Sequence, residues 1–121
     1  MANSYKELET GERPWGGWQV ISIGRNYVIK KVEVNPEHRL SLQYHNHRAE
    51  VWAIVSGLGE VVIGEESRQV KSGDCVGIPQ GVTHRITNIG EDLLVFIETQ
   101  NGNILDESDI VRIHDDYQRI K

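Results

Sequence analysis

The chain has 121 residues, 38% of them hydrophobic, which suits one domain that buries a core without disulfides. Its formal net charge is −5 and both signs are mixed along the chain, so neither nucleic acid nor a membrane is expected as a partner, because both need a basic face. No apolar run is long enough to cross a bilayer, and the polar start carries no signal core. The single cysteine makes no disulfide framework, so a cytoplasmic location is expected.

The chain begins with a polar stretch, residues 1–14, which is expected to form a loose arm ahead of a single domain covering residues 15–121. From Trp15 onward, short segments rich in Val and Ile alternate with turns marked by glycine. This spacing predicts an all-β sandwich or barrel. The expected strands cover residues 17–23, 26–34, 39–45, 50–57, 59–64, 74–79, 82–88 and 92–100, and the charged end is expected to add a short strand and a turn or helical piece.

Two histidines and a glutamate gather in the stretch QYHNHRAE. Side chains alternate along a strand, so Gln43, His45 and His47 are expected on one face. Glu50 has the wrong parity for that face, and a bend or bulge at residues 48–49 would restore it.

A third histidine follows the turn PQG, in a segment where Val82, His84 and Ile86 share one face. A closed barrel would bring His84 to the same point as the first stretch. Neutral imidazoles with a carboxylate suit a divalent ion, with Zn expected and Co, Mn, Fe or Ni as alternatives. The competing interpretation is a hydrogen-bonded core histidine and a solvated His-x-His pair. The expected ligands are His45, His47, Glu50 and His84.

These two histidine stretches resemble the paired motifs of the cupin superfamily, although His47 and Glu50 stand closer together than the corresponding residues in many cupins. The segments RPWGGW, LSLQYHNHRAEVW, IPQGVTHRITN and DESDIVRIHDDYQR further resemble type II phosphomannose isomerase. In that family the module is usually the C-terminal part of a bifunctional mannose-1-phosphate guanylyltransferase, and here a stand-alone domain is expected. The resemblance implies a cupin (double-stranded β-helix, jelly-roll) barrel. It also implies metal-dependent interconversion of mannose 6-phosphate and fructose 6-phosphate, in the supply of sugar nucleotides and polysaccharide precursors.

The resemblance also implies roles for particular residues. The four expected metal ligands match the family pattern, and Arg48 would be required for activity. Many members carry His where this chain has Asn46 and Val51, but alternation places both positions away from the expected metal face.

A sugar phosphate as substrate needs cationic and polar partners, and Lys30, Arg48 and Gln43 are the candidates. Lys30 shares an otherwise apolar face with Val28 and Val32, and its alternative is a chain that reaches the rim. Arg48 can grip phosphate with two hydrogen bonds. Two other functions stay open, a metal-dependent cupin oxygenase and a non-catalytic sugar-phosphate-binding cupin, and a homodimer is expected.

Overall fold

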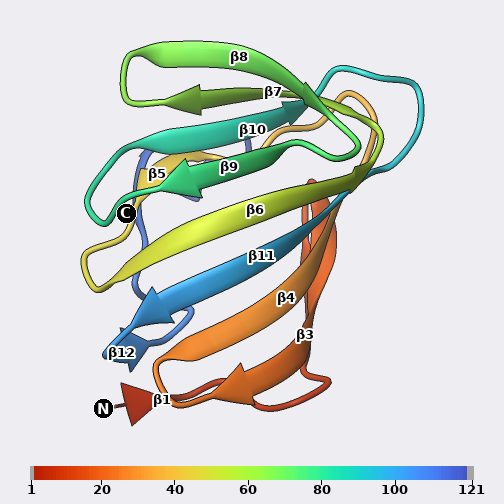
Figure 1. Cartoon of the computed structure of the whole chain (residues 1–121). Coiled ribbons are helices and arrows are strands. Elements are labelled where there is room, and N and C mark those ends of the chain that lie inside the picture. The colour runs from red at the N-terminus through yellow and green to blue at the C-terminus, as the bar shows by residue number, and fades with distance from the viewer. Residues whose placement is uncertain (1, 120–121) are drawn as a thin grey trace.

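The structure is a computed structural model that describes residues 2–119, and within this range every regular element is a β-strand (Figure 1). No helix in these residues is long and apolar enough to cross a membrane. The all-β prediction is confirmed. The strands are β1 (Ala2–Asn3), β2 (Thr10–Arg13), β3 (Gly16–Gly24), β4 (Tyr27–Val34), β5 (Leu42–Tyr44), β6 (Arg48–Ser56), β7 (Leu58–Ile63), β8 (Glu66–Lys71), β9 (Cys75–Ile78), β10 (His84–Asn88), β11 (Leu94–Gly102), β12 (Ile104–Leu105) and β13 (Val111–His114).

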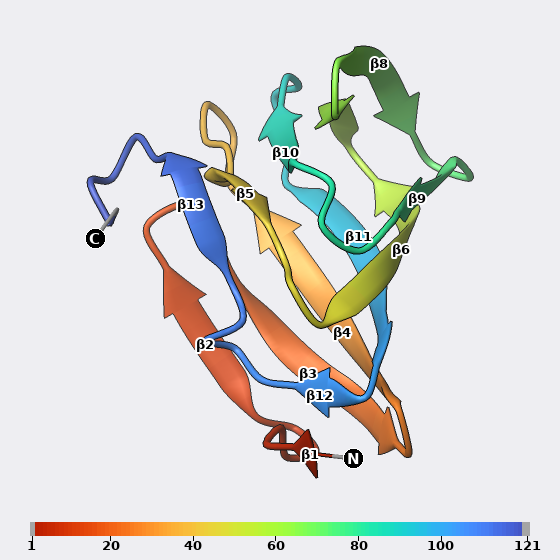
Figure 2. The same ribbon diagram turned by 90° about the vertical axis from the view of Figure 1, so that its left-hand side faces the viewer.

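Two antiparallel sheets form the body of the domain. One has six strands in the order β2-β3-β4-β11-β6-β9, and the other has five in the order β13-β5-β10-β7-β8. The two sheets face each other across the interior (Figure 2). Burial along β4 and β11 alternates with period two, because every second side chain points inward. The core between the sheets includes Val20, Val28, Val32, Val34, Ile54, Val61, Ile86, Leu94 and Phe96.

The N-terminal segment differs from the expected loose arm. β1 pairs with β12, and β2 extends the six-stranded sheet by pairing with β3. Tyr5 is buried, and its ring meets the edge of Trp18 at a centroid distance of 6.2 Å. Two aromatic residues therefore anchor a segment whose other residues are mostly polar, and composition alone hid this anchor.

β8 is a strand that the sequence pattern did not reveal. Only Val70 of its six residues is buried, and the other five are exposed. It pairs with β7 at the edge of the five-stranded sheet, where backbone hydrogen bonds hold it without a buried face.

Candidate metal centre

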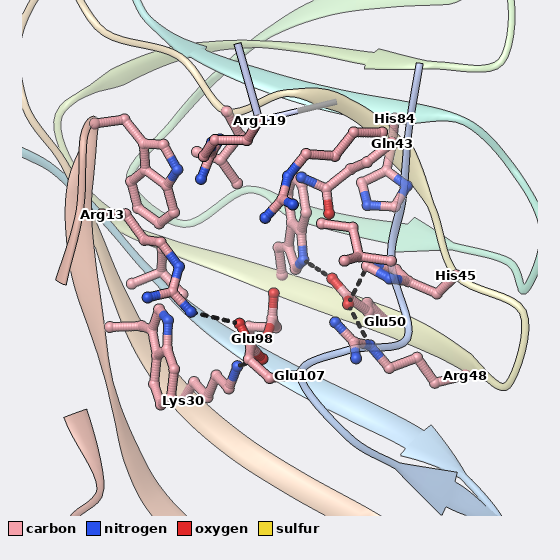
Figure 3. A pocket seen from close by; sticks show the side chains of 17 residues that line it. Arg13, Lys30, Gln43, His45, Arg48, Glu50, His84, Glu98, Glu107 and Arg119 are labelled. Atoms are coloured by element: carbon pink, nitrogen blue, oxygen red, sulfur yellow. Dashed lines mark hydrogen bonds and ion pairs between the residues drawn. The ribbon is translucent and has the colours of Figure 1, made fainter. Parts of the chain in front are cut away.

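Three side chains meet inside the barrel, between the two sheets. His45 follows β5, Glu50 lies on β6, and His84 opens β10. One possible ligand atom from each lies within 4.8 Å of the other two, and all three side chains are buried. Figure 3 shows them pointing toward one another across one end of the pocket. The expected convergence of these three residues therefore agrees with the structure.

Backbone carbonyls orient both imidazoles. His45 Nδ1 lies 2.6 Å from the carbonyl oxygen of Asp109, and His84 Nδ1 lies 3.0 Å from that of Val82. A carbonyl only accepts, so each Nδ1 carries a proton, and Nε2 is the ring nitrogen of each histidine that could bind a metal. The N–H of Gly81 also donates to the His45 carbonyl at 2.9 Å, which ties the turn before β10 to the end of β5.

Glu50 is the charged member of the cluster. Its Oε1 accepts a hydrogen bond from Trp52 Nε1 at 2.9 Å, and its Oε2 accepts one from Arg48 Nε at 2.9 Å. Burial opposes ionisation, but the Arg48 guanidinium and the hydrogen bond with His45 hold the pKa of Glu50 well below its ordinary value. Glu50 is therefore an ionised carboxylate deep inside the protein.

These residues fit a divalent cation. Both ring nitrogens of His45 face oxygen acceptors, since its Nε2 lies 3.1 Å from Glu50 Oε2. A divalent ion placed between Nε2 and the carboxylate would bind both groups while Nδ1 stays hydrogen-bonded to the Asp109 carbonyl. Burial lowers the pKa of His84, which keeps that imidazole neutral and able to bind a metal. Two nitrogens and one carboxylate oxygen suit Zn, Co, Mn, Fe or Ni, and the donor set does not choose among them.

The structure does not bring His47 into this cluster. The backbone N–H groups of Asn46 and His47 donate to the two carboxylate oxygens of Asp109, each at 2.9 Å. The chain therefore bends at residues 46–47, before the position expected from the sequence, and the next inward side chain is Arg48. His47 is left exposed, so its expected role as a ligand does not agree with this geometry.

Gln43 points inward, on the same face as His45, as the alternation along the strand predicts. It is buried, it lies directly opposite His84 on the neighbouring strand, and it lines the same pocket. Its Nε2 donates to Ser41 Oγ at 3.0 Å. If His45 rather than His47 is the histidine that precedes Glu50 in the metal motif, four residues separate the two. The spacing is then no longer shorter than in many cupins. Gln43 thus lines the pocket beside His84, at the position that the revised spacing gives to a fourth polar group.

Lys30 points into the pocket, as its place on an apolar face predicts. Its Nζ lies 2.7 Å from Glu107 Oε2 and 4.0 Å from the centroid of the Trp18 ring. Burial opposes the charge on Glu107, yet Lys30 lowers the pKa of this carboxyl to about 2. The ammonium of Lys30 is therefore already matched by a carboxylate of the protein.

Glu98 is a pocket residue that the sequence reasoning missed. It lies on the inward face of β11 and is buried, and its carboxylate accepts a hydrogen bond from Gln100 Nε2 at 2.9 Å. Burial, followed by the negative charge of Glu50, raises the pKa of Glu98 to about 7. The sequence contained a signal for this position. Glu98 is two residues from Phe96 and four from Leu94, so it shares their inward face, just as Lys30 shares a face with valines.

Comparison with known proteins places this site in a family. The model of the family described as mannose-6-phosphate isomerase C-terminal matches residues 2–115. The chain belongs to this family. It is 47% identical over 107 residues to the xanthan biosynthesis protein XanB of Xanthomonas campestris pv. campestris, and this covers 88% of the chain and 23% of that protein.

A second relative shows the same partial coverage. Mannose-1-phosphate guanylyltransferase ManC of Salmonella typhimurium is 40% identical over 108 residues, which is 89% of the chain and 22% of that protein. The chain thus spans about a quarter of the length of these relatives. A solved protein with a double-stranded β-helix domain from Klebsiella pneumoniae superimposes with a TM-score of 0.67 at 19% identity, over 78% of the chain and 80% of that protein. The fold is that of the cupins.

Proposed function

We propose that the chain is a metal-dependent aldose–ketose isomerase that interconverts mannose 6-phosphate and fructose 6-phosphate. The observation that supports this is the buried cluster of His45, Glu50 and His84 at the end of a pocket lined with cations, in a member of this family. In this proposal, the reaction contributes to the supply of sugar nucleotides and polysaccharide precursors.

The reaction moves a proton between carbons 1 and 2 of the sugar, and negative charge develops on the attached oxygens. A divalent ion held by His45, Glu50 and His84 would supply a Lewis acid for those oxygens. The pocket keeps this chemistry away from water, because all three side chains are buried.

A base must carry the proton, and Glu98 is the side chain that we assign to this step. Three carboxylates line the pocket, Glu50, Glu98 and Glu107. Lys30 holds Glu107 at 2.7 Å and Arg48 holds Glu50 at 2.9 Å. The hydrogen bond to Glu98 instead comes from the neutral amide of Gln100, so the Glu98 carboxylate is the one left to accept a carbon-bound proton.

Arg48 acts on the reaction through Glu50. Besides its bond to that carboxylate, it donates from Nη1 to the carbonyl oxygen of Asp106 at 3.1 Å, so its guanidinium is held in the wall of the pocket. Gln43 and Lys30 remain proposed substrate contacts, Gln43 beside His84 and Lys30 at the pocket floor with Glu107.

The test is formation of fructose 6-phosphate from mannose 6-phosphate by the purified chain, reconstituted separately with Zn, Co, Mn and Fe(II), with and without oxygen. We expect turnover that is independent of oxygen, that is lost in His45→Ala and that falls by a factor of about 100 or more in Glu98→Gln. His47→Ala is the matched control and is expected to keep its activity. A folded, metal-loaded protein without turnover would contradict the proposal and favour a sugar-phosphate-binding cupin. Turnover that requires oxygen would favour the oxygenase.

A further inference from the structure

The cations of the pocket differ in how far the protein itself neutralises them. Lys30, Arg48 and Arg119 each hold a carboxylate oxygen, at 2.7, 2.9 and 2.7 Å. Arg13 lies 3.3 Å from Glu107, whose carboxylate Lys30 already shares. These internal pairs leave Lys30 and Arg48, the phosphate contacts expected from the sequence, with little charge to offer a ligand. The full set that lines the pocket is Arg13, Lys30, Arg48, Arg112 and Arg119.

Arg112 is the exception. Among residues 2–119 its guanidinium takes part in none of the ion pairs, and its buried Nε has no hydrogen-bond partner. Burial lowers the pKa of Arg112, and the positive charges of Arg119 and Arg13 add to this effect against the opposing negative charges of Asp115 and Glu107. A buried guanidinium donor without an acceptor destabilises a protein, and an anion at this point would satisfy the donor and offset the repulsion.

The strand register fixes where this arginine lies relative to the metal centre. Arg112 on β13 stands directly opposite Gln43 on β5, and Gln43 stands directly opposite His84 on β10. The three residues form one row across neighbouring strands and all line the pocket. Two strand spacings separate the backbone of Arg112 from that of His84, a distance of about 10 Å. In Figure 3, Arg13 and Arg119 likewise lie across the pocket from His45 and His84.

We propose that Arg112, flanked by Arg13 and Arg119, is the binding subsite for a phosphate monoester whose other end reaches His45, Glu50 and His84. A guanidinium matches phosphate because two of its N–H groups donate to two phosphate oxygens. A hexose 6-phosphate has the required shape, since its phosphate is at the far end of the chain from carbons 1 and 2. The identity of the sugar rests on the proposed function, but the anion site does not.

The subsite is tested by binding, without turnover. Metal-free protein in phosphate-free buffer is titrated with inorganic phosphate, with mannose 6-phosphate and with neutral mannose, and binding is followed by two-dimensional NMR of the backbone amides. We expect both phosphates to shift the amides of β13 and its neighbours. In Arg112→Gln the dissociation constant for mannose 6-phosphate should rise by a factor of about 10 or more. Arg25→Gln, at an exposed turn, is the matched control and should bind like wild type.

Each outcome decides a different question. Equal phosphate binding by wild type and Arg112→Gln, or no binding by wild type, overturns the subsite. The variant loses no hydrogen bond at the buried Nε, so its NMR spectrum should show the same fold. Phosphate binding that depends on Arg112 in a protein without turnover leaves the subsite standing and removes the isomerase. If the protein turns over mannose 6-phosphate and its KM is unchanged in Arg112→Gln, the isomerase proposal stands and the subsite is overturned.

Discussion

Replacing Glu98 by glutamine should stabilise the metal-free protein at neutral and alkaline pH. The pKa of Glu98 is raised from 4.5 to about 7, by burial first and then by the charge of Glu50, against the opposing charges of Lys30 and Arg48. Below pH 4.5 the carboxyl is protonated in both folded and unfolded chains, and its full contribution to stability is present. As the pH rises through about 7 the folded protein must ionise a buried group, and that stability is lost. At about 1.4 kcal/mol for each pH unit between the two pKa values, the loss is about 3 kcal/mol.

Urea unfolding of chelator-treated protein between pH 4.5 and 8.5, followed by tryptophan fluorescence, measures this difference. Glu98→Gln should equal wild type near pH 4.5 and exceed it by about 3 kcal/mol above pH 7.5. Glu107→Gln serves as a comparison in which the change in stability has the opposite sign. The pKa of Glu107 is lowered in the folded protein, so its carboxylate stabilises the fold above pH 4.5, and the variant should be less stable than wild type at pH 7. Because Glu50 raises the pKa of Glu98, the difference between Glu98→Gln and wild type includes the relief of repulsion between these two carboxylates. A Glu98→Gln difference that stays constant with pH would refute the reasoning.

Further outcomes follow from the site. Zinc at 100 times its dissociation constant should add about 2.7 kcal/mol of stability to wild type and raise its melting temperature, reversibly with a chelator; no shift would argue against a metal centre. In calorimetric titrations, His84→Ala should lose zinc binding and His47→Ala should keep it, and equal loss in both would restore His47 as a ligand. Trp52→Phe removes the donor to Glu50 Oε1 and should cost about 1–3 kcal/mol in unfolding experiments. A homodimer remains a prediction, and light scattering after gel filtration checks it.

Alternation along single strands was enough to predict much of the pocket. Lys30 and His84 were placed on inward faces because their neighbours two residues away are apolar, and the structure agrees. The same rule applied to β11 would have found Glu98. What single strands do not contain is the position of a bend, and the bend at residues 46–47 depends on Asp109, about sixty positions later.

The bend explains why His47 lies outside the cluster of the other three expected ligands. A bend one or two residues later would have kept it inside, and nothing in the local sequence distinguishes the two cases. The lack of a hydrogen-bond partner at Arg112 Nε is a property of the folded pocket that the sequence does not reveal. The N-terminal segment was expected to be loose because most of its residues are polar. In the structure, packing of the buried Tyr5 ring against Trp18 anchors the segment to the sheet.

Asp109 gives the metal centre an order of assembly. Its carboxylate holds the backbone of Asn46 and His47, and its carbonyl orients His45, so one residue near the end of the domain sets the aim of the first ligand. Ribosomes release the three ligands before they release Asp109. A nascent chain that has completed β11 can therefore pair its strands while the His45 ring still lacks its guide. Zinc captured at full affinity by a chain ending at residue 103 would contradict this order. The geometry of the candidate centre thus depends on a residue that is synthesised after all three candidate ligands.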